Sequence, residues 1–324
     1  MILRNTKQCS TIIRDFGNIV IAGHIDPDGD AIASCTALSL YILESAKNAP
    51  TILLEDVKER YKIIGADRFL KDAYEGTPDL FIAVDCGDFS RLSAYAQELF
   101  KKARKTLLID HHISNPLFAD YNYVLPNASS TSEIIFEIIN AEMPVTNKEI
   151  AAALYAGIVF DTGGFRHSST SSRTHYITSL LIGCGIDLTG IYDEIMNVHT
   201  VKEAAARSLV IEKSKLDRGI MISVVTLEDM AKKGVNSCDF EGSVNYLLAT
   251  RGANAAVFIY EKKPTEFKVS MRSKKIDVSA VAQLFGGGGH KHAAACVMKS
   301  DPRETDVLVK TVCIELIERL SKCQ

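Results

Sequence analysis

The sequence predicts an α/β protein whose first domain holds a doubly wound, mainly parallel sheet and whose second domain is a smaller mixed α/β unit. Strand-length apolar runs alternate with helical segments in the first half of the chain. These runs are apolar at nearly every position, which is typical of strands buried on both faces by helices. After about residue 190 the pattern changes and new strand candidates follow. The chain of 324 residues is long enough for two such domains.

Four apolar runs predict the strands of the first domain. They lie at residues 18–23, 51–55, 80–85 and 106–110. Segments of helical composition lie between them, at 30–46 and 90–103. Further helical patterns follow at 131–140, 147–160 and 171–182. Because buried strands that alternate with helices are joined by crossover connections, this order favours a parallel sheet.

A domain boundary is expected where the pattern changes. Residues 191–216 have the composition of one or two amphipathic helices, which suits a connector. Strands are predicted beyond it at 219–226, 254–261 and 266–272, with a closing helix near 303–322. We therefore expect a first domain at 1–190, a helical linker at 191–215 and a second domain at 216–324.

Composition excludes several classes of protein. The longest uncharged apolar stretch, at residues 150–160, is too short to span a bilayer, and the first residues lack the apolar core of a signal peptide. The eight cysteines are scattered without a CxxC pair, which indicates reduced thiols and a cytoplasmic protein. A net charge of −3 provides no overall field to attract long duplex nucleic acid.

The charge is nevertheless uneven along the chain. Residues 251–299 contain nine Lys or Arg against three Asp or Glu, a local net charge of +6. One interpretation is a solvated face of strands and loops. The other is an anion-binding face on the second domain. Both interpretations stay open at this point.

Side chains of metal-ligand type follow three of the four predicted strands. In open α/β sheets, sites gather outside the carboxyl ends of the strands, so residues far apart in sequence meet there. A further carboxylate ends the apolar run 151–160. The ligand cluster is His24, Asp28, Asp30, Asp85, Asp110, His111, His112 and Asp161. So many carboxylates placed close together repel one another, and only a bound cation offsets that cost in free energy.

The residue types also indicate which cation. Carboxylate and imidazole without thiolate suit Mn²⁺, Mg²⁺ or Fe²⁺ better than a structural zinc. So many carboxylates favour two ions that share a bridging Asp and lie about 3.5–4 Å apart, the arrangement used for phosphoryl displacement. An Asp after a strand more often caps a helix or a turn, and that role is expected for Asp26 and Asp88. A structural or exposed role is expected for His167, His175 and His199.

Six ordered motifs resemble those of the DHH phosphoesterase superfamily. The first four are HxxPDxD at 24–30, VDCGD at 84–88, DHH at 110–112 and FDTGGF at 160–165. The other two, VSMRS at 269–273 and GGGGHKHAAA at 286–295, resemble the DHH-associated C-terminal domain of the exonuclease and nanoRNase/pAp phosphatase branch. The resemblance covers nearly the whole chain. Ala33 and Ala295 stand where many members have glycine, and neither is a proposed ligand.

The resemblance implies a role for each member of the ligand cluster. One ion would be held by His24, Asp28 and Asp85. The other would be held by Asp30, Asp85, His111 and Asp161. Asp85 would bridge the ions, and a hydroxide that they activate would be the nucleophile. His112 would contact the scissile phosphate, and Asp110 would accept a hydrogen bond from a neighbouring imidazole. The expected catalytic residues are thus His112, Asp110 and Asp85.

The second domain is expected to bind the substrate. Consecutive glycines leave backbone N–H groups uncovered and permit positive φ, which can form an anion-binding nest. Taken alone, the glycine run would be a flexible loop; beside Arg272, His290 and the basic excess, it favours binding of a terminal phosphate or a base. The expected substrate-binding residues are His112, Arg272, Ser273, Gly287, Gly288, Gly289 and His290. The active site is expected in a cleft between the two domains.

The expected function is that of a Mn²⁺-dependent hydrolase that degrades short oligoribonucleotides and dephosphorylates adenosine 3′,5′-bisphosphate by two-metal hydrolysis. A processive enzyme on long strands usually needs an extended basic channel, whereas one basic patch suits a ligand of a few nucleotides. One alternative is a linear or cyclic di-AMP phosphodiesterase. Another is a catalytically silent nucleotide-binding regulator. Short RNA and adenosine bisphosphate are the expected partners, and a homodimer is also compatible with the sequence.

Overall fold

The computed structural model describes residues 1–45, 49–55 and 57–321. It divides into two compact units, Met1–Val198 and His199–Gln324, here called the first and second unit. The predicted helices 30–46 and 303–322 each end on a residue outside the described part of the chain.

The first unit contains a sheet of five parallel strands in the order β2-β1-β3-β4-β5. The strands are β1 (Ile19–Ala22), β2 (Thr51–Leu53), β3 (Leu80–Val84), β4 (Lys105–Asp110) and β5 (Tyr121–Val124). The four predicted strands and their parallel arrangement are confirmed. The fifth strand was not predicted, because its sequence, YNYV, is short and has a polar residue at a buried position.

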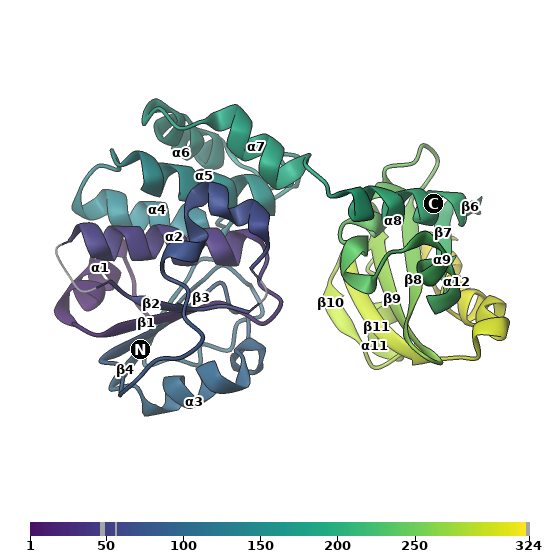
Figure 1. Cartoon of the computed structure of the whole chain (residues 1–324), viewed down its shortest axis with the longest axis horizontal. Helices are drawn as coiled ribbons and strands as arrows, with labels where there is room; N and C mark the ends of the chain where they lie inside the picture. The colour runs from purple at the N-terminus through teal and green to yellow at the C-terminus, as the bar shows by residue number, and fades with distance from the viewer. Residues whose placement is uncertain (46–48, 56, 322–324) are drawn as a thin grey trace. The chain divides into compact units, whose positions relative to one another are not determined.

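Helices cover both faces of this sheet, so the doubly wound arrangement is confirmed (Figure 1). On one face lie α1 (Thr6–Asp15), α2 (Gly29–Glu44), α4 (Thr131–Glu142) and α5 (Lys148–Asp161), and on the other lies α3 (Ala94–Lys102). The helices α6 (Ser172–Gly183) and α7 (Leu188–Met196) pack outside α5. Three short 3₁₀ helices complete the unit at Glu59–Ile64, Ala66–Arg68 and Phe89–Arg91.

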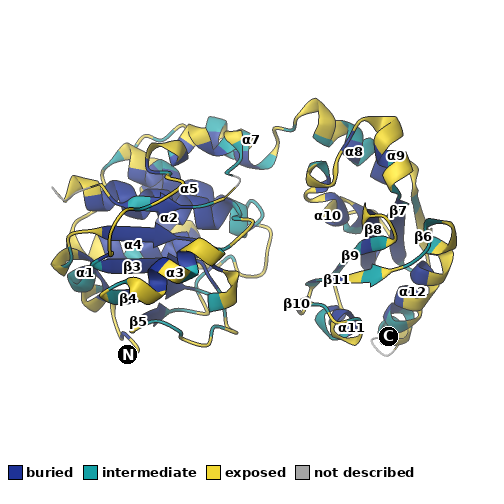
Figure 2. Ribbon diagram, turned by 60° about the horizontal axis from the view of Figure 1, so that its bottom comes forward, coloured by how far each residue is buried: buried dark blue, intermediate teal, exposed yellow. Residues whose placement is uncertain are grey.

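The helices α2 and α5 pack against each other in the core of the first unit, and Figure 2 shows both as mostly buried. Both helices are apolar or small around nearly the whole circumference, which is typical of a helix enclosed by other elements. Gly157 of α5 allows the close approach, because a Cβ there would overlap the Ser132 side chain and lie 2.7 Å from Asp30 Oδ1. The packing of these helices therefore brings buried polar groups together under the edge of the sheet.

The second unit contains a mixed sheet of six strands in the order β10-β11-β9-β8-β7-β6. Its strands are β6 (Ser214–Asp217), β7 (Ile220–Val225), β8 (Ala255–Lys263), β9 (Glu266–Ser273), β10 (Gly288–His290) and β11 (Ala293–Lys299). Only β7 and β8 pair in parallel. The mixed α/β class is confirmed, but β6, β10 and β11 were not predicted. The strand β6 begins inside the stretch expected as a helical linker. The glycine and alanine runs of β10 and β11 do not show apolar–polar alternation.

Helices of the second unit build one hydrophobic core on each face of its sheet. The helices α8 (Val201–Glu212), α9 (Leu227–Lys233) and α10 (Ser243–Leu248) cover one face, and α11 (Ser279–Leu284) and α12 (Thr305–Ser321) cover the other. Two 3₁₀ helices lie at Ser237–Phe240 and Pro302–Glu304. Among the described helices of the whole chain, none combines the length and apolarity needed to cross a membrane.

The stretch 191–215, expected as a linker, is shared between the two units. Its first residues belong to α7, which packs on α5 and the 3₁₀ helix Glu59–Ile64. Its later residues form α8, which packs on β7 and α9. The chain passes from one unit to the other near Val198 and His199.

Candidate metal centre

The ligand cluster assembles at the carboxyl edge of the parallel sheet. The ends of β1, β3 and β4 are level there, because Ala22 pairs with Ala83 and Val84 pairs with Ile109. The ends of these strands and the segments that follow them supply every member of the cluster except Asp161, the last residue of α5. The structure therefore brings the eight predicted residues to one place, as parallel strand order requires.

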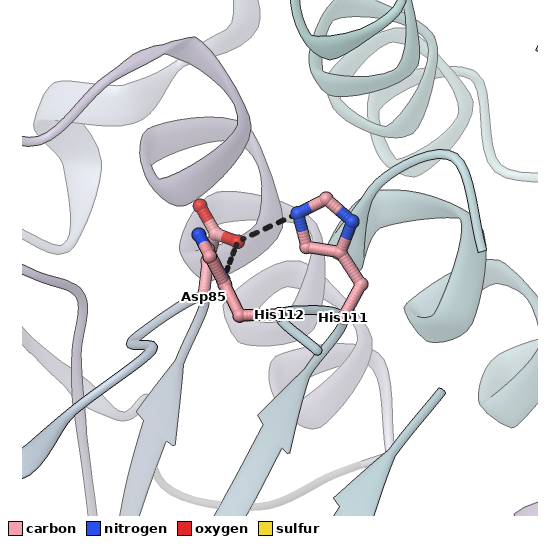
Figure 3. A group of neighbouring side chains, drawn as sticks. All are labelled: Asp85, His111 and His112. Atoms are coloured by element: carbon pink, nitrogen blue, oxygen red, sulfur yellow. Dashed lines mark ion pairs between the residues drawn. The ribbon is translucent and has the colours of Figure 1, made fainter. Parts of the chain in front are cut away.

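Among the described residues, three groups of side chains could hold a metal ion, and within each group the ligand atoms lie within 4.8 Å of one another. They are His24–Asp28–Asp85, Asp30–His111–Asp161 and Asp85–His111–His112. Asp85 belongs to two groups, and Figure 3 shows its carboxylate between the two imidazoles of the DHH motif. His111 Nε2 lies 3.5 Å from Asp85 Oδ1 and 3.5 Å from Asp161 Oδ2. The first two groups are thus linked through Asp85 and His111.

Backbone carbonyls orient two of the histidines. His24 Nδ1 lies 2.7 Å from the carbonyl oxygen of Ile25, and His111 Nδ1 lies 3.3 Å from that of Ala128. A proton on Nδ1 satisfies each contact, which leaves Nε2 with its lone pair toward the carboxylates. His24 Nε2 accordingly faces Asp28 Oδ2 at 3.9 Å. This is the arrangement in which an imidazole accepts a metal ion.

His112 has a different partner. Its Nδ1 lies 2.7 Å from Oδ1 of Asp110, which is fully buried. The other oxygen of Asp110 accepts a hydrogen bond from the Asn115 amide. Burial works against the Asp110 charge, but the hydrogen bond from His112 and the amide of Asn115 hold the pKa of that carboxyl below its usual range. Asp110 therefore stays ionised and fixes the tautomer and the ring orientation of His112.

Three of the other carboxylates, Asp30, Asp85 and Asp161, are costly to keep charged. Burial, reinforced by the neighbouring carboxylates, raises the pKa of Asp85 and of Asp161 well above the usual value. Burial also raises the pKa of Asp30. Burial works against a charge on His111, yet Asp85, Asp161 and Asp30 raise the pKa of its imidazole to about 9. A cluster that attracts protons so strongly has an excess of negative charge, and hard divalent cations fit it.

The N-terminus of α2 positions two more carboxylates. Asp28 is the N-cap, and its Oδ1 accepts from the backbone N–H groups of Asp30 and Ala31 at 3.1 and 3.2 Å. Burial alone would raise the pKa of Asp28, but His24 and these amides hold it below its usual range. Asp30 lies in the first turn of the same helix. It accepts from the backbone N–H groups of Thr131 and Ser132 at 2.6 and 3.0 Å.

Several polar contacts of the cluster were not predicted from the sequence. The Thr131 hydroxyl donates to Asp85 Oδ1 at 2.9 Å, and Ser34 donates to Asp30 Oδ1 at 3.2 Å. Arg91 Nη2 donates to the Ile25 carbonyl at 3.4 Å, the same carbonyl that His24 Nδ1 contacts. One available signal was the hydroxyl-rich run SSTSE at 129–133, which directly precedes an apolar helix and matches an N-cap pattern.

The aspartates and histidines expected to have structural roles are placed as follows. Asp88 caps the 3₁₀ helix Phe89–Arg91 by accepting from Ser90 N, as predicted. Asp26 has a left-handed backbone with φ of 52°, which agrees with a turn. His167 Nδ1 contacts the Asp161 carbonyl at 3.0 Å, and His175 stacks on Phe165. Asp85 also has a positive φ of 54°, a conformation that concentrates at functional sites.

Arg272 and Ser273 lie at the end of β9 in the second unit. Arg272 Nη1 donates to the Met271 carbonyl at 3.0 Å, and burial lowers the pKa of the guanidinium. Ser273 is buried. Its hydroxyl donates to the Asn254 carbonyl at 3.3 Å and accepts from the N–H groups of Lys275 and Ile276 at 3.0 and 2.9 Å. The structure therefore gives Ser273 a role in holding the turn after Arg272.

The glycine run forms the turn into β10 and the strand itself. A Cβ on Gly287 would overlap the backbone of β11, and Gly289 has φ of +140° and equally little room. Gly288 faces open space. Two of the three predicted glycines are therefore needed for the close pairing of β10 with β11, whatever they bind. The backbone of His290 belongs to β10, and its side chain lies outside the described residues.

Comparisons with known proteins agree with this geometry. Residues 18–158 match the model of the DHH family, N-terminal domain, and residues 217–317 match that of the DHHA1 domain. A Thermus thermophilus protein named bifunctional oligoribonuclease and PAP phosphatase NrnA is 28% identical over 87% of this chain and 85% of its own length. The cyclic-di-AMP phosphodiesterase PdeA of Listeria monocytogenes is 25% identical over 89% of this chain but only 46% of its own length.

A solved structure shares the fold of both units. It is an exopolyphosphatase-related protein from Bacteroides fragilis, with a TM-score of 0.87 at 24% sequence identity, and the match covers 97% of each chain. The two matched domains follow one another in the chain, and the four expected DHH motifs converge at the sheet edge. The chain belongs to the DHH family of phosphoesterases, which are metal-dependent hydrolases.

Proposed function

We propose that this protein hydrolyses very short RNA and removes the 3′-phosphate of adenosine 3′,5′-bisphosphate, with two divalent ions as cofactors and Mn²⁺ as the native ion. The observation that carries the proposal is the pair of ligand groups linked through the contact between Asp85 and His111. The oligoribonuclease and PAP phosphatase name of the Thermus relative, which aligns along most of both chains, supports the substrate class.

The proposed ligands are the members of these two groups, with Asp85, which lies 3.5 Å from His111, added to the second as the bridge. His24, Asp28 and Asp85 would hold one ion. Asp30, Asp85, His111 and Asp161 would hold the other. Mixed oxygen and imidazole donors without thiolate support Mn²⁺ over zinc. Two divalent ions, when bound, lower the pKa of water toward neutral and offset the charge on a phosphate.

The Asp110–His112 pair is proposed to act on the substrate. His112 Nδ1 carries a proton and donates it in a hydrogen bond to Asp110. Because Nδ1 faces Asp110, Nε2 on the other side of the ring points away from it. From this position the doubly protonated form of His112 would donate a hydrogen bond from Nε2 to an oxygen of the scissile phosphate and stabilise the negative charge that develops there. Asp110 would contribute by positioning the ring.

The second unit is proposed to hold the nucleotide. Arg272 offers a planar, bidentate donor set for a phosphate or a stacking surface for a base. Gly288 has open space beside it, and Gly287, Gly289 and His290 complete the proposed subsite. The local net charge of +6 over residues 251–299 supports an anionic ligand. The expected cleft between the units stays a prediction.

A substrate panel tests the proposal. Metal-free protein is reloaded with Mn²⁺ and assayed on pApA, RNA of 2–10 nucleotides, adenosine 3′,5′-bisphosphate, cyclic di-AMP and pyrophosphate. We expect the highest kcat/KM on the shortest RNA, with measurable release of phosphate from adenosine bisphosphate. A preference for pyrophosphate, or no Mn²⁺-dependent turnover of any nucleotide, would contradict the proposal.

The alternative of a linear or cyclic di-AMP phosphodiesterase is favoured by one observation, the similarity to the Listeria phosphodiesterase. That protein is more than twice as long as the matched region, which weakens the inference. The same panel separates the two functions, because the alternative predicts cyclic di-AMP as the best substrate. The complete ligand cluster argues against a catalytically silent regulator. A cytoplasmic location and a homodimer stay predictions.

A further inference from the structure

Thr131 contacts both proposed metal-ligand groups. It is the first residue of α4 and is fully buried. Its backbone N–H donates to Asp30 Oδ2 at 2.6 Å, and its hydroxyl donates to Asp85 Oδ1 at 2.9 Å. Asp30 belongs to the group with His111, and Asp85 belongs to the group with His24. One residue therefore binds a carboxylate of each group.

The two hydrogen bonds have different physical origins. The first N–H groups of a helix have no partner within the helix, so Asp30 satisfies donors of α4 that would otherwise be orphaned. The hydroxyl of Thr131 is a side-chain donor that the helix itself does not need. It can therefore be removed without breaking the helix, and its contact with Asp85 is the separable part of the arrangement.

Asp85 requires such a contact if its carboxylate is to hold one orientation. Its backbone, at φ of 54°, sets the direction of the Cα–Cβ bond. The terminal torsion of an aspartate is broad, so the plane of the carboxylate is not set by the backbone. The Thr131 hydroxyl binds the same oxygen, Oδ1, that lies 3.5 Å from His111 Nε2. The Thr131 hydroxyl thereby selects which oxygen of Asp85 faces His111 and the group to which His111 belongs.

We propose that Thr131 is a positioning residue that aligns Asp30 with Asp85 and so sets the affinity of the protein for its pair of metal ions. This inference rests on the proposed two-metal function. Thr131 does not contact the substrate in this proposal. It acts through Asp85, as groups outside the ligand set do when they orient a metal-binding carboxylate.

The main test is Thr131→Val, which keeps the β-branched shape and the backbone N–H but removes the hydroxyl. Mn²⁺ binding to metal-free protein is measured by competition with a chelating indicator dye. We expect the variant to bind Mn²⁺ about 10- to 100-fold more weakly than the wild type. Thr131→Ser restores the hydroxyl and should recover most of the affinity.

The chain offers a matched control. Thr174 is also fully buried near the N-terminus of a helix, and its hydroxyl donates to a buried carboxylate, that of Glu133, at 3.0 Å. Glu133 is not a proposed ligand. Thr174→Val removes that hydrogen bond together with the capping hydrogen bond that the hydroxyl accepts from Ser171 N at 3.1 Å. It should therefore lower the melting temperature without Mn²⁺ at least as much as Thr131→Val does, while Mn²⁺ affinity stays at the wild-type value.

The outcomes separate this inference from the proposed function. Wild-type protein that does not bind Mn²⁺ would overturn both. Wild-type affinity in Thr131→Val, an equal loss in Thr174→Val, or no recovery in Thr131→Ser would overturn the role of Thr131 alone, since the two-metal proposal does not depend on it.

Discussion

Asp85→Asn is predicted to have opposite effects on the protein with and without metal. The substitution keeps the shape of the side chain but removes its charge. Asp85 is 2% exposed, and burial raises its pKa well above the usual value. In the metal-free protein the charge of Asp85 therefore lowers the free energy of unfolding. With both ions bound, the same charge would offset the positive charge of both ions.

The size of the effect follows from the distances. Ligand atoms of Asp85 and Asp28 lie within 4.8 Å, and two like charges at that separation repel by about 3 kcal/mol at an effective dielectric constant of about 20. His111 at 3.5 Å returns an attraction of about 5 kcal/mol when it is protonated. The loss of hydration costs several kcal/mol for a buried ion, which exceeds the net attraction of about 2 kcal/mol, and Asp30 adds further repulsion. We expect the metal-free variant to be more stable than wild type by about 1–2 kcal/mol near pH 8.

With Mn²⁺ the order reverses. Wild type should gain about 2.7 kcal/mol at a Mn²⁺ concentration 100 times its dissociation constant, and the variant should gain little. The kcat of the variant on pApA should fall by at least about 10³-fold. Urea unfolding with and without Mn²⁺, metal analysis and single-turnover kinetics measure these three quantities. Full metal content with near-normal turnover, or a metal-free variant clearly less stable than wild type, would refute the reasoning.

Three further predictions concern other residues of the site. Arg272→Ala should lower kcat/KM for pApA by about 10- to 1000-fold with unchanged metal content. The small ester bis-p-nitrophenyl phosphate does not extend to the proposed nucleotide subsite, so the variant should hydrolyse it at nearly the wild-type rate. An equal loss on both substrates would assign Arg272 to the fold. Asp110→Asn should keep Mn²⁺ bound but lower kcat by about 10²- to 10⁴-fold, because His112 loses its orienting partner; loss of metal instead would make Asp110 part of the ligand set. Since the pKa of His111 is raised from 6.5 to about 9, its protonated form stabilises the metal-free protein fully below pH 6.5, and this contribution is lost as the pH rises through about 9. Mn²⁺ must displace that proton, so its apparent affinity should rise about tenfold per pH unit between about pH 6.5 and 9, and calorimetry that detects no proton release in this range would contradict the assignment.

The strands of the first unit and their ligand-type residues were predictable because each depends on local sequence. A buried strand has an apolar composition that needs no knowledge of its neighbours, and parallel order makes the ends of such strands meet. His24, Asp28, Asp85 and His111 therefore came together as expected, although they are far apart in the chain. By contrast, β10 and β11 were missed, since they are held by backbone pairing of glycine and alanine, which carries no alternating pattern.

By itself, the sequence determined the class of the fold, the family and the set of side chains at the sheet edge, because composition and motif spacing act over short distances along the chain. Only the tertiary structure decided how these side chains are held. Thr131 donates to both Asp30 and Asp85, which are 101 and 46 residues away from it, and Gly157 is required by the approach of two helices. Such contacts depend on which polar atoms face one another after packing. A serine or threonine before a helix has the same local pattern whether its hydroxyl faces water, its own helix or a buried carboxylate.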